Sequence, residues 1–223
     1  MAINRSVGRT AVSVAEAHLA RVAGDGSSRH RHLTALLEAS GLNSSRDLAD
    51  CVHLLCGLHG RHPSLVELAY RNAEAGAGRD WLARAAEGFE RERLFLVRLT
   101  SAVGPMPSTP GAAETEATMN AQRNALEILA TSERRGCALG AAAALVGDWW
   151  PIRRILDRAA SRAGLDSPAP ALPDEVSVIA AIDAASDTMA AERALGFGSE
   201  QLLLQHRGLF DLLEARSEAR RDY

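Results

Sequence analysis

The chain has 223 residues, a formal net charge of −3, 47% hydrophobic residues and 4% aromatic residues, a length sufficient for one large domain with a substantial core. It contains no lysine, so all 25 basic residues are arginine. This absence excludes P-loop, Schiff-base and kinase-type lysine chemistry, because each of these needs the ammonium group.

Helix-forming residues dominate the chain, since Ala, Leu, Arg and Glu all favour helices, and no stretch alternates convincingly like a β-strand. In chain order, the spacing of apolar residues predicts helices over residues of about 10–23, 33–40, 45–58, 63–75, 79–103, 112–148, 151–163, 174–195 and 199–220. We therefore predict an all-α protein, a multi-helix bundle of about seven to nine helices built around the two long helices at 79–103 and 112–148.

The predicted organisation is a single all-α domain over residues 1–223, in which residues 1–32 form an N-terminal helix and loop and the Pro-rich segment 165–173 is a candidate linker. The N-terminus lacks the pattern of a signal peptide, and no apolar run approaches the ~20 residues of a membrane span. Three cysteines without a CxxC pair suit reduced thiols, which favours a cytoplasmic protein. Arginines interleaved with acidic residues argue against a nucleic-acid partner, and we expect no membrane partner.

Five polar side chains project onto the apolar faces of four predicted helices when each helix is turned by 100° per residue. They are His59, Glu92, Glu133, Asp148 and His206. Burial of an unpaired carboxylate is costly, so these groups either satisfy one another or serve a ligand or metal ion. The same projection places Asp50 and His53 away from the apolar stripe of their helix.

Carboxylates and imidazoles that project inward from facing helices are how di-iron and di-manganese bundles bind metal. The segments FERERLFL around Glu92 and ATSERRGCALGAAAAL around Glu133 resemble the long helices of ferritin-like and haem-oxygenase-like bundles. That resemblance implies an iron or manganese site, for which Glu92, Glu133, His59, His206 and Asp148 are the candidate ligands. The chain departs from the ferritin-like pattern because it contains no Glu-x-x-His motif. Small residues at Gly136, Gly140 and Ala144 would also allow close approach of a helix or a flat ligand.

A second interpretation of the same residues is structural. Glu92, Glu133 and Asp148 would pair with arginines such as Arg93, Arg123 or Arg134, and the histidines would be hydrogen-bonded core residues. His53 and His59 lie about 120° apart on a continuous helix, so they cannot share one ion, and Gly60 interrupts the helix before His62. A structural role is therefore favoured for most of these histidines. The thiols of Cys51 and Cys137 face apolar stripes, where burial makes them inert.

The function remains open between two classes. The first is a bundle whose polar core cluster binds a metal, a small cofactor or another small-molecule ligand. The alternative is a structural or interaction protein that forms a homodimer through its C-terminal helices, because Leu202 to Leu204 and Leu209 to Leu213 supply more apolar surface than one stripe needs. A distant third is an isoprenoid-type enzyme, since Asp183 and Asp187 are spaced like paired magnesium-binding aspartates. No residue is singled out as catalytic.

Overall fold

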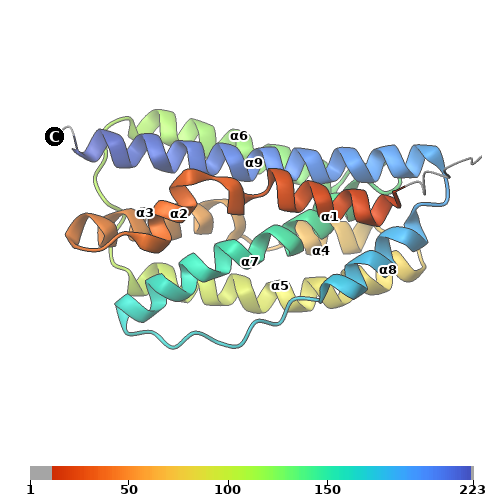
Figure 1. The fold of residues 1–223 in the computed structure, drawn as a ribbon, viewed down its shortest axis with the longest axis horizontal. Coiled ribbons are helices and arrows are strands. Elements are labelled where there is room, and N and C mark those ends of the chain that lie inside the picture. The colour runs from red at the N-terminus through yellow and green to blue at the C-terminus, as the bar shows by residue number, and fades with distance from the viewer. Residues whose placement is uncertain (1–11, 222–223) are drawn as a thin grey trace, which may run out of the picture.

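The computed structural model describes residues 12–221, which form nine α-helices and one short 3₁₀ helix and contain no strand (Figure 1). The all-α class and the number of helices are thus confirmed for this part of the chain. The elements are α1 (Val14–Asp25), η1 (Ser27–Arg29), α2 (Arg31–Glu38), α3 (Leu42–His59), α4 (Leu65–Asn72), α5 (Ala77–Ala102), α6 (Ala112–Ala130), α7 (Cys137–Ala163), α8 (Glu175–Ala185) and α9 (Met189–Arg221). Three helices are long rather than the predicted two, because α5, α7 and α9 contain 26, 27 and 33 residues.

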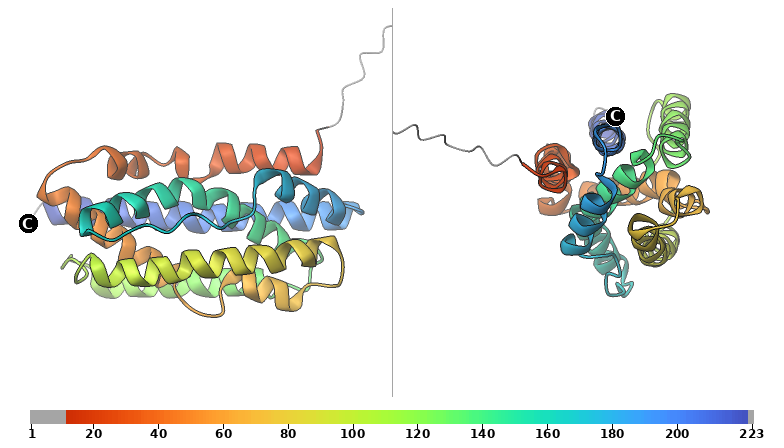
Figure 2. Two further views of the ribbon diagram at one scale, coloured as in Figure 1. Left: turned by 90° about the horizontal axis from the view of Figure 1, so that it is seen from below. Right: turned by 90° about the vertical axis from the view of Figure 1, so that its right-hand side faces the viewer.

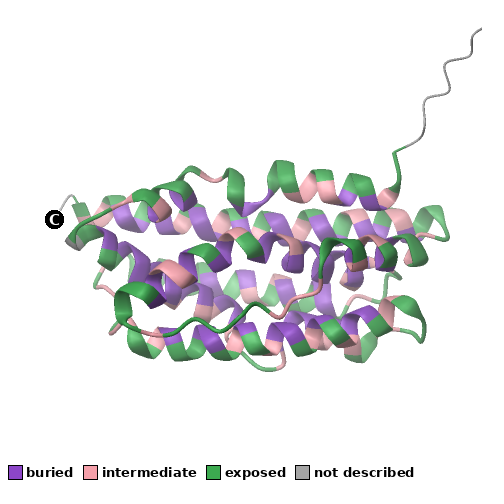
Figure 3. Cartoon of the chain, turned by 60° about the horizontal axis from the view of Figure 1, so that its bottom comes forward, coloured by how far each residue is buried: buried purple, intermediate pink, exposed green. Residues whose placement is uncertain are grey.

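Helix α7 occupies the centre of the bundle and crosses the other long helices obliquely (Figures 1 and 2). Helix α9 runs the length of the molecule on one side of α7, and α5 runs along the other side. Helices α1 and α2 cover α7 and α9 on one face, while α3, α4 and α6 complete the bundle between α5 and α9. Because α7 has neighbours on most sides, nearly all residues of its first half are buried (Figure 3).

Glycines allow α7 and α9 to touch backbone to backbone. A Cβ atom placed on Gly140 would lie 2.1 Å from the carbonyl oxygen of Leu195, and one placed on Gly198 would lie 2.0 Å from the carbonyl oxygen of Cys137. Real Cβ atoms never approach a carbonyl oxygen this closely, so the contact requires glycine at both positions. The small-residue run of α7 therefore accommodates a helix, which is one of the two occupants expected from the sequence.

The single helix predicted over 112–148 is wrong, because the chain forms α6 and α7 with a turn over residues 131–136 between them. Gly136, the residue before α7, has a φ of +94°. A positive φ cannot continue a right-handed helix, so the direction of the chain changes here. The spacing of apolar residues continues through this turn because both helices pack on the same core. For this reason the spacing alone does not indicate that the helix ends at Ala130.

Helix α7 continues through Pro151, where the sequence suggested a new helix. A proline inside a helix costs about 3 kcal/mol, since it removes one hydrogen bond and crowds the carbonyl four residues earlier. Trp149 and Ile152, on either side of the proline, are both 0% exposed. Their burial against neighbouring helices holds both halves of α7 in line, so tertiary packing offsets the local cost.

The predicted boundary between the last two helices is also corrected. The helix expected over 174–195 ends at Ala185, and α9 begins at Met189, where the hydroxyl of Thr188 accepts a hydrogen bond from the amide of Ala191 at 3.1 Å. From there α9 continues through the glycines at 196 and 198, because Gly198 packs directly against α7.

The Pro-rich segment proposed as a linker is extended, and it packs along the bundle (Figure 1). A Cβ on Gly88 of α5 would lie 2.3 Å from the carbonyl oxygen of Ala171, so the segment touches the α5 backbone. Arg153 of α7 also donates a hydrogen bond to the carbonyl of Pro168. None of the helices in residues 12–221 has the length and apolar character that crossing a membrane requires.

Candidate functional site

A continuous chain of buried polar groups crosses the centre of the bundle. Asp148 Oδ2 of α7 lies 2.6 Å from Nδ1 of His206 on α9, and Nε2 of His206 lies 3.0 Å from Nε2 of His59 on α3. At its other end, the carboxylate accepts hydrogen bonds from the amide of Ser27 at 2.7 Å and from the Ser27 hydroxyl at 2.5 Å. These four side chains are between 0% and 5% exposed. We call Ser27, Asp148, His206 and His59 the polar chain.

The hydrogen bonds of the polar chain determine where its protons lie. Nδ1 of His206 faces a carboxylate, so it carries a proton and donates it. Burial lowers the pKa of His59 well below its usual value of 6.5, and the facing His206 ring acts in the same direction, so His59 is neutral. With the His206 proton on Nδ1, Nε2 of a neutral His206 accepts, and His59 donates the one proton of the contact between the two Nε2 atoms. The arrangement is therefore a directed chain of hydrogen bonds from His59 through His206 to Asp148, shielded from water.

Glu92 belongs to a second buried group beside the polar chain. Its carboxylate accepts hydrogen bonds from Arg153 Nη1 at 2.7 and 2.9 Å and from the indole nitrogen of Trp149 at 3.0 Å. The ring of Trp149 packs edge-on against that of His59, with centroids 5.5 Å apart, and so joins the two groups. Pairing of Glu92 with an arginine agrees with the structural interpretation, although the partner is Arg153 rather than the expected Arg93.

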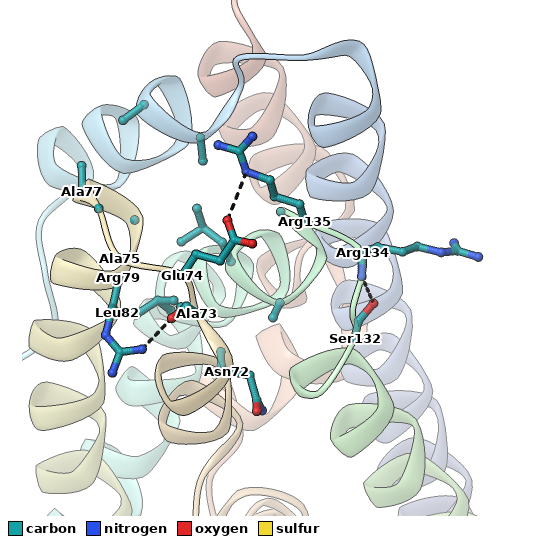
Figure 4. Close-up of a pocket in the computed structure, with 18 of the residues that line it drawn as sticks. Asn72, Ala73, Glu74, Ala75, Ala77, Arg79, Leu82, Ser132, Arg134 and Arg135 are labelled. Atoms are coloured by element: carbon teal, nitrogen blue, oxygen red, sulfur yellow. Dashed lines mark hydrogen bonds and ion pairs between the residues drawn. The ribbon is translucent and has the colours of Figure 1, made fainter.

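Glu133 lies outside both groups. It is exposed in the turn between α6 and α7, so the prediction that it faces the core is wrong. That turn lines a pocket of about 220 Å³ at one end of the bundle, together with the turn between α4 and α5 (Figure 4). Arg135 reaches across this pocket to within 3.9 Å of Glu74 and pairs with Asp187 at 2.9 Å. Because Arg135 faces two carboxylates, its charge is compensated within the protein.

A third buried group involves Asp50, which the projection had wrongly placed on the polar side of its helix. Asp50 is 0% exposed and accepts hydrogen bonds from Arg216 at 2.8–3.2 Å and from Arg220 at 2.6 Å. Arg220 also donates to Asp47 at 2.7 Å. The partners come from α9, more than 160 positions away in sequence, so no local pattern signals them. The arginines act as a clamp that ties the end of α9 to α3.

The remaining histidines of α3 and its following turn do not converge. Nε2 of His53 lies 2.8 Å from the carbonyl of Gly104, and Nδ1 of His62 lies 3.1 Å from Glu67. The expectation that most of these histidines are structural fits these contacts. Burial raises the pKa of the Cys51 thiol, and the charge of Asp50 adds to the effect, so Cys51 is an inert thiol at neutral pH.

An open groove of about 460 Å³ lies between α1, α7 and the start of α8. Its walls are mainly apolar, with contributions from Leu19, Val22, Val146, Trp150, Pro151 and Val178. Asp148 also lines the groove, so one residue belongs both to the groove and to the polar chain. Largely apolar grooves with a few polar groups are typical of small-molecule sites.

His18 of α1 is the second polar residue of interest in this groove. It is 4% exposed, and its Nδ1 lies 2.7 Å from the hydroxyl of Ser199 on α9. Its Nε2 is buried and has no hydrogen-bond partner within residues 12–221. Burial and the charge of Arg21 lower the pKa of His18 to about 4, so the ring is neutral at pH 7. Sequence reasoning missed His18 because only the packing of α1 against α7 and α9 buries it.

The two shifted histidines predict how stability depends on pH. An unfolded chain protonates His18 below its usual pKa of 6.5, whereas the folded protein keeps it neutral down to about pH 4. The contribution of this group is therefore complete above pH 6.5, and about 3 kcal/mol is lost as the pH falls to 4. His59 acts in the same direction. We expect the free energy of unfolding, measured with urea, to decrease between pH 7 and 5.

A His18→Asn variant isolates the contribution of this one ring, since Asn hydrogen-bonds but does not titrate. The slope of its unfolding free energy against pH should be smaller than that of the wild type. The difference corresponds to at most one proton taken up on unfolding. Parallel curves for the two proteins would contradict the assignment.

The polar chain brings together three of the five predicted metal ligands, His59, His206 and Asp148, and Trp149 links them to Glu92. Among the residues that the structure describes, no group of three or more His, Cys, Asp or Glu side chains is arranged to hold a metal ion. Asp148 is hydrogen-bonded to Ser27 and His206, and Glu92 is paired with Arg153. The inward placement of these four residues is confirmed, and their role as ligands stays a prediction.

Comparison with known proteins places the chain in a family without assigning an activity. No curated protein and no solved structure matches it significantly. The sequence profile of a family of unknown function, DUF6975, matches residues 22–221, which include the polar chain and most of the groove. The chain therefore belongs to this family of unknown function, DUF6975.

Proposed function

We propose that the protein binds a small molecule in the groove between α1, α7 and α8, and that the polar chain holds a proton beneath the bound molecule. The observation that carries this proposal is the double role of Asp148. The residue lines the groove, and its carboxylate is hydrogen-bonded to His206. A molecule bound in the groove therefore interacts electrostatically with a buried, hydrogen-bonded pair of imidazoles.

Physical chemistry favours this site over the other buried groups. Glu92 and Asp50 are each paired with arginines, which makes them salt bridges of the core. The polar chain instead contains a histidine with a strongly lowered pKa, next to a groove that holds a second such histidine, His18. Titratable groups shifted by burial beside a groove are typical of functional sites. Within this arrangement Asp148 orients His206, and His59 donates a hydrogen bond to the Nε2 atom of His206.

The proposal is tested by screening a library of neutral and charged aromatic fragments with isotope-labelled protein and NMR. We expect binding fragments to shift the signals of Val22, Trp150 and Val178. They should also move the Nδ1–H resonance of His206, because its acceptor Asp148 lies in the groove wall. A library in which no fragment shifts these groove signals would refute the proposed function.

Two matched variants locate the binding. Ala23 and Ala17 are both exposed residues of α1, but only Ala23 lines this groove, while Ala17 lines a neighbouring one. Ala23→Trp should fill the groove and abolish the shifts, and Ala17→Trp should leave them unchanged. Equal loss in both variants would mean that the fragments bind elsewhere on α1.

A second candidate function is metal binding between the two histidines of the polar chain. The Nε2 atoms of His59 and His206 are 3.0 Å apart with their rings at 89°, which is close to the spacing of adjacent imidazole ligands on one ion at about 2.1 Å from each nitrogen. Asp148 would then support His206 from behind, as carboxylates do in metal sites. Elemental analysis of tag-free protein tests this, and iron or manganese should be lost in His206→Ala. Metal-free protein that takes up neither ion would exclude it.

The homodimer through the C-terminal helices also stays a prediction. Phe197 and Leu204 of α9 are 42% and 46% exposed, so this helix presents apolar side chains outside the core. Sedimentation equilibrium distinguishes a dimer from a monomer, and Leu204→Glu should dissociate a dimer that uses this surface.

A further inference from the structure

The charged residues around the groove are all of one sign. Asp148 and Glu175 are its two charged lining residues within the part of the chain described, and both are acidic. No arginine lines this groove, although the chain contains 25 of them. The arginine nearest in sequence to the groove residues of α1, Arg21, lies in the neighbouring groove and donates to the carbonyl of Gly196 at 3.2 Å. The field in the groove therefore favours a cation.

The helix backbone supplies a further acceptor. In an α-helix, the carbonyl of residue 147 normally accepts a hydrogen bond from the amide of residue 151. Pro151 has no amide hydrogen, so the Gly147 carbonyl lacks this donor. Both residues line the groove. The central helix thus offers a carbonyl oxygen to a ligand at the level of Asp148.

Two further residues that line the groove are His18 and Trp150. His18 is more than nine-tenths buried, lines the groove, and has an Nε2 without a hydrogen-bond partner. Its Nδ1 lies 2.7 Å from the Ser199 hydroxyl and its Nε2 is buried, so His18 contributes an uncharged polar side chain to the groove wall at pH 7. Trp150 is 43% exposed and also lines the groove. An indole ring attracts cations to its face.

We infer that the ligand of this groove is an organic amine bound as its ammonium ion, with an apolar body against Val22, Trp150 and Val178. The ammonium group donates a hydrogen bond to the Gly147 carbonyl, and Asp148 and Glu175 compensate its charge. This inference rests on the proposed function and adds the class of ligand. A carboxylate or phosphate would meet two like charges and no donor from arginine, so anions are disfavoured.

Three probes of similar size test the inference: phenethylamine, 2-phenylethanol and 3-phenylpropionate. Each is titrated into labelled wild-type protein at pH 7, and the dissociation constant is taken from the shifts of Val22, Trp150 and Val178. We expect the amine to bind at least about tenfold more tightly than the alcohol, and the carboxylate to bind most weakly. The three molecules share one aromatic body, so the difference reports the charge.

Two variants test the groups that recognise the ammonium ion. Pro151→Ala restores an amide that donates to the Gly147 carbonyl, so it should weaken amine binding by about fivefold and raise the melting temperature. Pro173→Ala is its control, because Pro173 also lines the groove but lies outside the helices. Glu175→Gln changes an exposed position. It should weaken binding of the amine by about threefold and leave binding of the alcohol unchanged.

The outcomes separate the two proposals. If the alcohol or carboxylate binds in the groove as tightly as the amine, the amine inference is wrong and the proposed small-molecule site stands. Unchanged amine binding in both Pro151→Ala and Glu175→Gln would also overturn the inference. If none of the probes and none of the library fragments shifts the groove signals, the proposed function fails as well.

Discussion

Replacement of Glu92 by alanine should lower the free energy of unfolding by about 3–5 kcal/mol. Glu92 and Arg153 are 2% and 3% exposed, so the arginine would be left as an unpaired charge in the core. The indole nitrogen of Trp149 would lose its acceptor at the same time. The measurement is urea unfolding at pH 7 followed by circular dichroism.

The control for this prediction is the other carboxylate partner of the same arginine. Asp157 accepts from Arg153 Nε at 2.8 Å, but its side chain is 42% exposed. Asp157→Ala should therefore cost less than about 1 kcal/mol, as solvent-exposed pairs do. Similar losses in the two variants would contradict the interpretation that burial makes the Glu92 pair important.

Gly198→Ala is the second substitution with a large expected effect, a loss of about 3 kcal/mol or more in unfolding free energy. The added Cβ would lie 2.0 Å from the carbonyl oxygen of Cys137, and backbone atoms on both sides of the contact cannot rotate away as a side chain can. Helices α7 and α9 would have to separate, which would disturb the contact between Asp148 and His206. Urea unfolding measures the loss, and the Nδ1–H resonance of His206 should shift.

Gly196→Ala, two residues earlier in α9, is the matched control. Its Cβ would meet the guanidinium of Arg21 at 3.4 Å, which is an ordinary contact with a flexible side chain. Alanine is a better helix former than glycine by about 1 kcal/mol, so this variant should be as stable as the wild type or more stable. A destabilisation equal to that of Gly198→Ala would show that the close approach of α7 and α9 is not the cause.

Most residues of the candidate site could be recognised in the sequence as polar residues at apolar positions of predicted helices. His59, Glu92, Asp148 and His206 occupy positions in apolar stripes, and all four are buried. Which of them meet was not visible, because Asp148 and His206 are 58 positions apart and come together only where α7 and α9 cross. The predicted inward placement of Glu133 is wrong because helix α6 ends at Ala130. A helical projection does not apply to residues beyond the end of the helix.

Asp50 shows the opposite error, since the projection placed it on the polar side of its helix, and His18 was not singled out in the sequence. Asp50 is buried because Arg216 and Arg220 approach it from the end of α9, and His18 because α1 packs over α7 and α9. A helical projection reports one helix at a time. The burial of a residue on its flank depends on neighbours whose positions that projection does not contain.

The sequence by itself determined the all-α class and the approximate positions of most helices, because helix propensity and apolar periodicity are local properties. It also determined that polar groups would enter the core. The tertiary structure decided that α7 passes through Pro151 and that α9 passes through Gly198, since packing energy there outweighs local preference. It also decided which carboxylates meet arginine and which one meets a histidine beside a groove, because pairing depends on distances between helices far apart in sequence.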